Sequence, residues 1–103
     1  MKLSVKKGDY GYYLYFHIRD AKGSPIDLVG YTLNLKAWVL GAPGDIKWTI
    51  TGSIINALKG VSRFEVANTH FTTAGKYVGE IELTKAGVVE STETFDLEVM
   101  ESA

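Results

Sequence analysis

Apolar and polar residues alternate along most of this chain with a period of two. Between Tyr12 and Ile18 the even positions are apolar, and between Tyr31 and Val39 the odd positions are apolar. Because successive side chains of a strand point to opposite faces of a sheet, each stretch predicts a strand with one buried face. No window sustains the spacing of three and four that a helix requires. The pattern therefore predicts an all-β chain.

The rest of the chain divides into further short strands separated by turns. Gly52 marks a bend or bulge, so one long, bent strand is expected there, and a link without strand structure is expected over Ala67–Ala74. The predicted strands are Leu3–Lys7, Tyr12–Ile18, Tyr31–Val39, Ile46–Leu58, Val61–Val66 and the two arms of a hairpin over Gly75–Val99. About seven strands with turns every 8 to 12 residues predict an immunoglobulin-like β-sandwich of two antiparallel sheets. A single domain is expected to occupy residues 1–103.

The hairpin over Gly75–Val99 has a loop whose length decides its register. A three-residue loop with Gly87 in the left-handed conformation pairs Thr84 with Val88. A two-residue loop would set Leu83 against Glu90 and mix apolar with charged side chains on one face, so it is disfavoured.

The three-residue loop also defines the inner face of the hairpin. It pairs Leu83 with Val89 and Tyr77 with Phe95, which keeps both ends of that face apolar. Together with the other alternating strands, this predicts a buried core that contains Leu14, Phe16, Leu33, Leu35, Phe64, Tyr77, Ile81, Phe95 and Leu97.

The charge and composition of the chain exclude several classes of function. Eleven lysines and arginines are scattered among twelve aspartates and glutamates, for a net charge of −1. No electrostatic footprint for nucleic acid or for an anionic membrane stands out. Cysteine is absent, which excludes disulfides, thiolate nucleophiles and thiolate metal sites. There is no secretion signal and no membrane span, so residence in a cytoplasm is the default expectation.

The residues that carry chemistry elsewhere do not form a recognisable constellation here. His17 and His70 are the only histidines, and neither has a partner at a metal-ligand spacing. Ser24, His17 and Asp20 could be combined into a triad, but no nucleophile elbow accompanies them. Four aspartates lie in turns, where they commonly bond their own backbone, and are too sparse for calcium: Asp9, Asp20, Asp27 and Asp45. No enzymatic activity, metal or cofactor is therefore expected.

A turn built from Gly23 and Pro25 opens the most informative stretch, which continues through Ile-Asp-Leu and Gly30 into an alternating strand that reaches Trp38. This stretch resembles the signature of the immunoglobulin-like N-terminal domain of phage baseplate upper proteins. The resemblance continues through Gly60–Phe64 and Thr73–Glu82 and covers nearly the whole chain.

The resemblance implies a structural role. Such a domain is a building block of the phage or prophage tail tip, where it docks on other baseplate proteins and has no enzymatic activity. It is made in the host cytoplasm and then becomes part of the virion tail. Because tail components generally assemble as rings, self-association is a further expectation. Tyr77 is similar to the tyrosine-corner residue of immunoglobulin-like folds, whose hydroxyl bonds upstream backbone. Structural roles are also expected for Pro25, Gly30 and Gly87.

Two surfaces are candidates for docking. The first is an outward stripe of Tyr13, Tyr15, His17 and Arg19, because exposed aromatic residues favour interfaces. These rings could equally lie under a loop or reflect strand propensity alone. The second is an acidic face of Glu80, Glu82 and Glu90, where the expected register sets Glu82 opposite Glu90 and Lys36 offsets the repulsion. A solvated face is the simpler reading of these glutamates.

A carbohydrate-binding β-sandwich module is the alternative from a different functional class. Such a module would use Trp38, Trp48 or the tyrosine stripe as platforms on which sugar rings stack. Trp38 points outward on the alternating pattern unless a bulge resets the register.

Overall fold

The computed structural model describes residues 2–101 and contains eight strands. Within that range there is no helix, and hence none long and apolar enough to cross a membrane. The prediction of an all-β chain is confirmed. The strands are β1 (Lys2–Lys6), β2 (Tyr12–His17), β3 (Thr32–Val39), β4 (Ile46–Asn56), β5 (Val61–Val66), β6 (Gly75–Lys85), β7 (Val88–Ser91) and β8 (Phe95–Met100).

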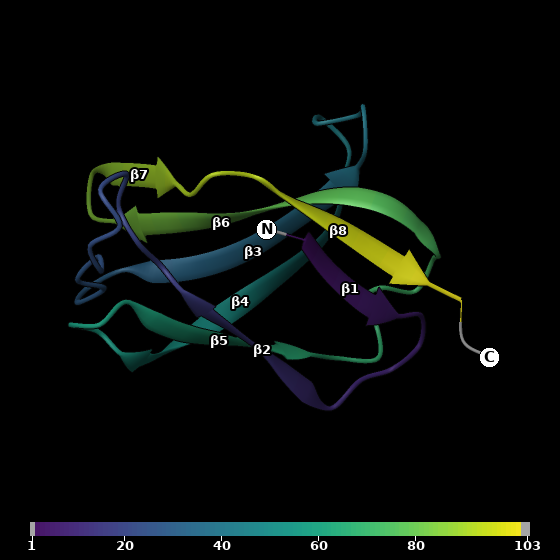
Figure 1. Cartoon of the computed structure of the whole chain (residues 1–103), viewed down its shortest axis with the longest axis horizontal. Helices are drawn as coiled ribbons and strands as arrows, with labels where there is room; N and C mark the ends of the chain where they lie inside the picture. The colour runs from purple at the N-terminus through teal and green to yellow at the C-terminus, as the bar shows by residue number, and fades with distance from the viewer. Residues whose placement is uncertain (1, 102–103) are drawn as a thin grey trace.

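The strands form one curled mixed sheet rather than two separate layers. Neighbouring strands follow the order β1-β8-β6-β3-β4-β5-β2, and β7 pairs with β6 outside this path. Figure 1 shows the sheet curling so that β2 and β5 pass below β3 and β6. The predicted sandwich of two antiparallel sheets is not confirmed, because strand β4 connects the two halves.

Strand β4 makes this connection by changing partners along its length. Its first half, up to Thr51, pairs with β3, and its second half, from Gly52 onward, pairs with β5. A side chain at Gly52 would collide with the ring of Phe64, so glycine is required where the sheet bends. The expectation of one long strand bent at Gly52 is confirmed.

One pair of strands runs parallel. β1 pairs with β8 in parallel, with Leu3 opposite Leu97 and Val5 opposite Val99. A purely antiparallel arrangement was therefore wrong for the first strand. The alternating stretch of β1 is too short to indicate which strand it pairs with. Parallel strands are joined by long connections, so no turn motif near β1 in the sequence identifies its partner.

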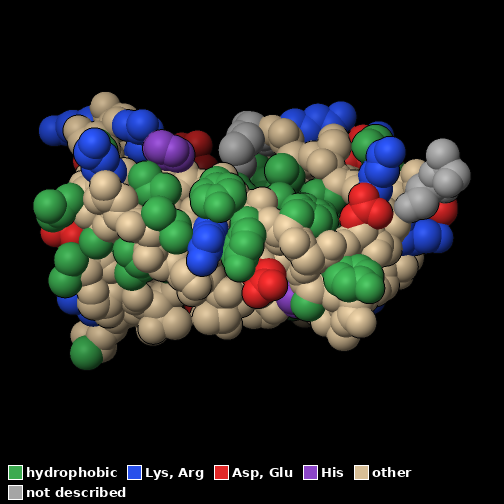
Figure 2. Space-filling model, turned by 90° about the horizontal axis from the view of Figure 1, so that it is seen from below, with side chains coloured by type: hydrophobic (Ala, Val, Ile, Leu, Met, Phe, Trp, Pro, Cys, Tyr) green, Lys and Arg blue, Asp and Glu red, His purple; other side chains and the backbone are tan. Residues whose placement is uncertain are grey.

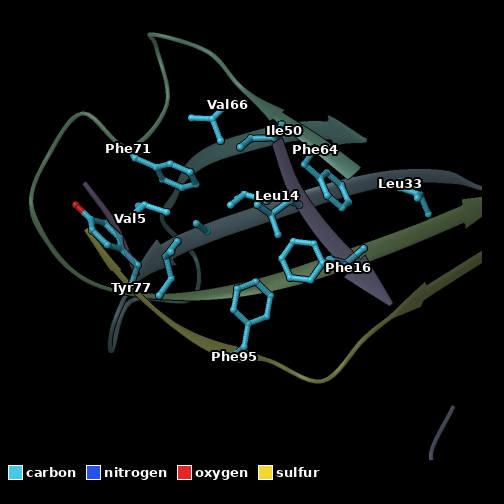
Figure 3. Packing of buried hydrophobic residues seen from close by; sticks show 14 of the residues in the cluster. Val5, Leu14, Phe16, Leu33, Ile50, Phe64, Val66, Phe71, Tyr77 and Phe95 are labelled. Carbon is cyan, nitrogen blue, oxygen red and sulfur yellow. The ribbon is translucent and has the colours of Figure 1, made fainter. Parts of the chain in front are cut away.

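The concave side of the curled sheet holds the core. Phe16 from β2 contacts Phe64 from β5 and Phe95 from β8, with ring centroids 5.6 and 5.5 Å apart. Figure 3 shows these three rings together, and Phe71 and Tyr77 toward the other end of the core. All nine core residues expected from the sequence are buried: Leu14, Phe16, Leu33, Leu35, Phe64, Tyr77, Ile81, Phe95 and Leu97.

The loop of the β6–β7 hairpin differs from its prediction. Lys85 pairs with Val88, so the loop has two residues, and Leu83 lies opposite Glu90. This is the register that alternation disfavoured. It is tolerated because β7 is exposed along its whole length and Glu90 reaches solvent. Gly87 does adopt the predicted positive φ, at 75°.

A one-residue bulge between β7 and β8 restores the apolar inner face. If the β6–β7 ladder continued unbroken, Gly79 would lie opposite Thr94, but its partner is Phe95. Tyr77 consequently pairs with Leu97 and not with Phe95. The bulge is held at Thr92, whose N–H donates to the Ile81 carbonyl at 2.9 Å and whose hydroxyl accepts from the Ile81 N–H at 3.1 Å. Because a shift of one residue exchanges the faces of a strand, β8 can point Phe95 inward.

Candidate docking surfaces

The outward aromatic stripe of β2 is exposed as the alternation predicts. Tyr13 and Tyr15 are 39% and 59% exposed, and their ring centroids lie 6.3 Å apart. No loop of the described chain buries these two rings. The residues that alternate with them on β2 point into the core. Exposed tyrosines on a strand offer apolar area at little conformational cost, which suits an interface.

Arg63, on the neighbouring strand β5, completes this surface. It lies directly opposite Tyr15 in the β2–β5 ladder, and its guanidinium carbon lies 4.2 Å from the centre of the Tyr13 ring. The arginine Nε is buried and has no hydrogen-bond partner among the described residues. We name Tyr13, Tyr15 and Arg63 together the tyrosine face. Figure 2 shows hydrophobic side chains on either side of a basic one on the underside of the molecule.

Sequence reasoning missed Arg63 but contained a signal for it. Phe64 was expected in the core, which places its neighbour on the same strand, Arg63, on the outside. What alternation does not give is the neighbouring strand. Only the pairing of β5 with β2 places this arginine beside the tyrosines.

The other two members of the predicted stripe are His17, the last residue of β2, and Arg19, which lies beyond the end of the strand. His17 is exposed and lies opposite Val61. Arg19 is also exposed, and its guanidinium donates to the Gly23 carbonyl at 3.1 Å, so it is tied to its own turn. All four residues of the predicted stripe, Tyr13, Tyr15, His17 and Arg19, are thus exposed, and the first three lie on β2.

The predicted acidic face does not hold all three of its glutamates. Glu80 and Glu82 lie on the outer side of β6, where Lys36 forms an ion pair with Glu82 at 2.9 Å. This pair matches the expected offset by Lys36. Glu90, however, pairs with Leu83, while Glu82 pairs with Ser91. The two-residue loop thus moves Glu90 to the opposite face, and the expected Glu82–Glu90 pair was wrong.

A groove of about 890 Å³ opens where the curled sheet fails to close. One wall is the end of β2 with the turn that follows it, and the other is the segment from Glu90 to Phe95. We name this feature the seam groove. Figure 1 shows the chain rising from β2 toward β7 on that side of the molecule.

The tryptophans do not form open platforms for sugar rings. Trp48 is half-buried and packs against Phe71 and Tyr77, with ring centroids 5.3 and 4.7 Å away. Trp38 is also half-buried. A bulge lies beside it, since Ala37 pairs with Trp48 whereas Trp38 pairs with Ile46. The residue left without a partner in this ladder is Lys47 in β4, and β3 keeps its register with β6 through Trp38, so the bulge does not reset the face of Trp38. Neither ring supports the carbohydrate alternative.

One ring nitrogen of His70 is occupied by a hydrogen bond from the backbone. Its Nδ1 accepts from the Ala67 N–H at 2.9 Å, and desolvation by partial burial lowers the pKa of the imidazole. Its neighbour Phe71 is fully buried at a φ of 52°, a conformation that a phenylalanine adopts only when packing holds it. Phe71 therefore closes the core at this end of the described chain.

Two of the aspartates expected in turns do bond their own backbone. Asp20 Oδ1 accepts from the N–H groups of Lys22 and Ser24, and Asp27 Oδ1 accepts from that of Val29. Residues 2–101 hold no group of three or more histidine, aspartate or glutamate side chains placed to share a metal ion.

The residues given structural roles occupy conformations that fit them. Gly30 has a φ of 82°, and the Lys85 side chain packs within 3.3 Å of where a Cβ would stand. Pro25 forms an isolated bridge with Arg19 that closes the turn after β2. The Tyr77 hydroxyl donates to the Thr73 carbonyl, upstream in the chain as expected.

Comparisons with known proteins agree with this architecture. A family model described as the BppU N-terminal domain matches residues 3–103. Among solved structures, the N-terminal domain of phage TP901-1 ORF48 is similar with a TM-score of 0.71 and 13% identity, over 95% of this chain and 83% of that chain. At this identity the likeness shows a shared fold. The search of curated proteins found no match.

Proposed function

Because the chain belongs to the BppU N-terminal domain family, we propose that it is a structural component of a phage or prophage tail baseplate that docks onto other virion proteins through its tyrosine face. The family model covers all but the first two residues, so the assignment applies to the whole described fold. Its role is to hold neighbouring proteins in place, and no reaction is assigned to it.

The observation that carries this proposal is the contact between Arg63 and the exposed ring of Tyr13. Tyrosine and arginine are the residues that most often dominate binding energy in interfaces. Here the arginine is already positioned by its contact with Tyr13 at 4.2 Å. A side chain that is ordered before binding loses less conformational entropy when a partner covers it, which favours association.

The tyrosine face is large enough to anchor an interface but not to complete one. Each aromatic side chain brings about 150 to 250 Å² when fully covered. A stable interface buries about 800 Å² on each partner. The contact must therefore extend beyond the tyrosines, and weak self-association that a neighbouring tail protein strengthens is the expected behaviour.

The direct test replaces both tyrosines and follows assembly. The double variant Tyr13→Ser and Tyr15→Ser should lose co-purification with tail proteins and show less self-association by light scattering. A control that combines Tyr10→Ser with Leu40→Ser removes two apolar side chains, 64% and 59% exposed, from outside the tyrosine face. This control should assemble normally. Unchanged assembly of the first variant, with its fold intact, would dismiss the tyrosine face.

A second variant separates the arginine's shape from its charge. Arg63→Lys keeps the positive charge but loses the planar group that stacks on Tyr13. We expect this variant to co-purify more weakly than the original protein while it melts at a similar temperature. Normal co-purification would show that only charge matters at this position.

A further inference from the structure

The seam groove combines an unpaired strand edge with an apolar floor. Strand β2 ends the order of paired strands, so one of its two edges has no neighbour among the described strands. The groove lies beside that edge, between β2 and the segment that joins β7 to β8. Natural proteins usually protect such an edge, because it is a template for pairing with another chain.

The hydrogen bonds of β2 show which backbone groups are free to pair. The Ile18 N–H donates at 2.7 Å to the carbonyl of Gly60, the residue opposite it when the β2–β5 register is extended. Residues bonded to the neighbour alternate with residues whose backbone faces away in an antiparallel ladder. Tyr13, Tyr15 and His17 therefore present their N–H and carbonyl groups to the open side.

The floor of the groove is apolar and well packed. Phe16 and Phe95 meet across it with ring centroids 5.5 Å apart, and Ile18, Ile81 and Leu83 line the same space. All five side chains are buried, so the floor is already packed before anything binds. An extended segment laid over it would add backbone hydrogen bonds along β2 and place alternate side chains against this floor.

The rim of the groove is acidic. Asp20, Glu90 and Glu93 line it, against the single guanidinium of Arg19, which donates to its own turn. Glu90 and Glu93 form no ion pair with any residue in the range 2–101. The two-residue loop of the β6–β7 hairpin brings Glu90 to this rim, which gives the unexpected register a consequence for binding.

We propose that the seam groove binds an extended, basic segment of another tail protein. The segment adds to β2 as a further strand, and its lysine or arginine side chains lie against Glu90 and Glu93. This mode of recognition takes affinity from main-chain hydrogen bonds and specificity from alternate side chains. The inference rests on the proposed function for the kind of partner. Tyr15 belongs to both surfaces, but the groove uses the backbone edge of β2 and the acidic rim, whereas the tyrosine face uses outward side chains, so the two have separate tests.

The experiment titrates the isotope-labelled protein with three synthetic peptides and follows backbone amides by NMR. The first is a seven-residue capped peptide that alternates lysine with valine. The second has the same sequence with every other backbone nitrogen methylated, and the third replaces lysine by glutamate. We expect the first peptide to shift the amides of Tyr13, Tyr15 and His17 and the other two to bind at least tenfold more weakly.

Variants of the protein test the same two contributions. Glu90→Gln combined with Glu93→Gln should weaken binding of the lysine peptide about three- to tenfold, as expected for two exposed ion pairs. The matched control, Glu80→Gln combined with Asp96→Asn, removes the same charge elsewhere and should leave binding unchanged. His17→Pro removes one edge donor without touching the β5 ladder and should weaken binding, with the melting temperature as the check on folding.

Several outcomes would overturn the proposal. These are equal binding of the methylated or glutamate peptide, amide shifts that spare both His17 and the Glu90–Phe95 segment, or equal affinity of the two charge variants. Saturation by a second copy of the chain in place of the peptide would also overturn it. Any of these results can occur while the tyrosine variants still lose assembly, so failure of this inference is distinguishable from failure of the proposed function.

Discussion

The Tyr77 hydroxyl donates a hydrogen bond of 2.7 Å to the carbonyl of Thr73, four residues upstream. This bond fastens the link after β5 to the start of β6, while the ring of Tyr77 packs on Trp48 at 4.7 Å. One side chain therefore joins the non-strand segment to the core. The resemblance drawn from the sequence placed a tyrosine corner at this residue, and the observed bond has that geometry.

The first prediction removes this bond and nothing else. Tyr77→Phe keeps the buried ring and leaves the Thr73 carbonyl without its donor. We expect a loss of about 1 kcal/mol in the free energy of unfolding, and up to about 3 kcal/mol if water cannot reach the carbonyl. Tyr10→Phe, at an exposed position, is the control and should change nothing measurable. Denaturant unfolding measures the free energy of unfolding of both variants. A Tyr77→Phe variant as stable as the Tyr10→Phe control would count against the tyrosine corner.

The second prediction compares three glycines in turns. Gly41 and Gly87 have φ values of 89° and 75°, and no atom lies within 4 Å of where their side chains would begin. Alanine should cost about 1 to 2 kcal/mol at each position, because the left-handed conformation strains any residue with a Cβ. Gly44 has the same open space without a positive φ, so Gly44→Ala should be neutral or slightly stabilising. Thermal melting of the three variants tests the order, and a harmless Gly87→Ala would contradict the observed turn.

Local alternation was sufficient to predict the faces of the strands. Leu14 and Phe16 point inward and Tyr13 and Tyr15 outward because a period of two fixes the side of each residue once the core is chosen. The glycines and prolines located the turns for the same local reason. These features depend on neighbours in sequence, so they can be read without knowledge of strand partners.

The strand partners and bulges could not be read in this way. The pairing of β1 with β8 joins opposite ends of the chain, and β4 divides its hydrogen bonds between two neighbours. The hairpin register was wrong because the inward alternation was assumed to run unbroken, whereas Thr92 inserts a bulge. The composition of the candidate surfaces depends on the same strand partners and bulges, so it was predicted only in part. Arg63 was missed, and Glu90 was placed on the wrong face.

The third prediction concerns the stability contributed by the core. Phe16 contacts Phe64 and Phe95 and is 8% exposed. Phe16→Ala should destabilise the protein by about 3 to 5 kcal/mol, because a buried phenylalanine loses both transfer free energy and packing. Tyr15→Ala, on the adjacent outward position, should cost far less. A melting temperature for Phe16→Ala within a degree or so of the original would contradict the assignment of the core.

The last prediction is a dependence of stability on pH that arises from His70. Partial burial lowers the pKa of this imidazole in the folded protein, and its Nδ1 accepts a hydrogen bond from Ala67. The unfolded chain therefore binds a proton more readily than the folded one. The contribution of the neutral His70 to the free energy of unfolding is complete at a pH above about 6.5, the ordinary pKa of histidine. This contribution is lost as the pH falls from about 6.5 through the lower pKa that His70 has in the folded protein. His70→Asn retains an acceptor and does not titrate, so the difference in unfolding free energy between the original protein and this variant should shrink or reverse between about pH 7.5 and pH 5. A difference that stays constant over this range would show that His70 has the same pKa in both states.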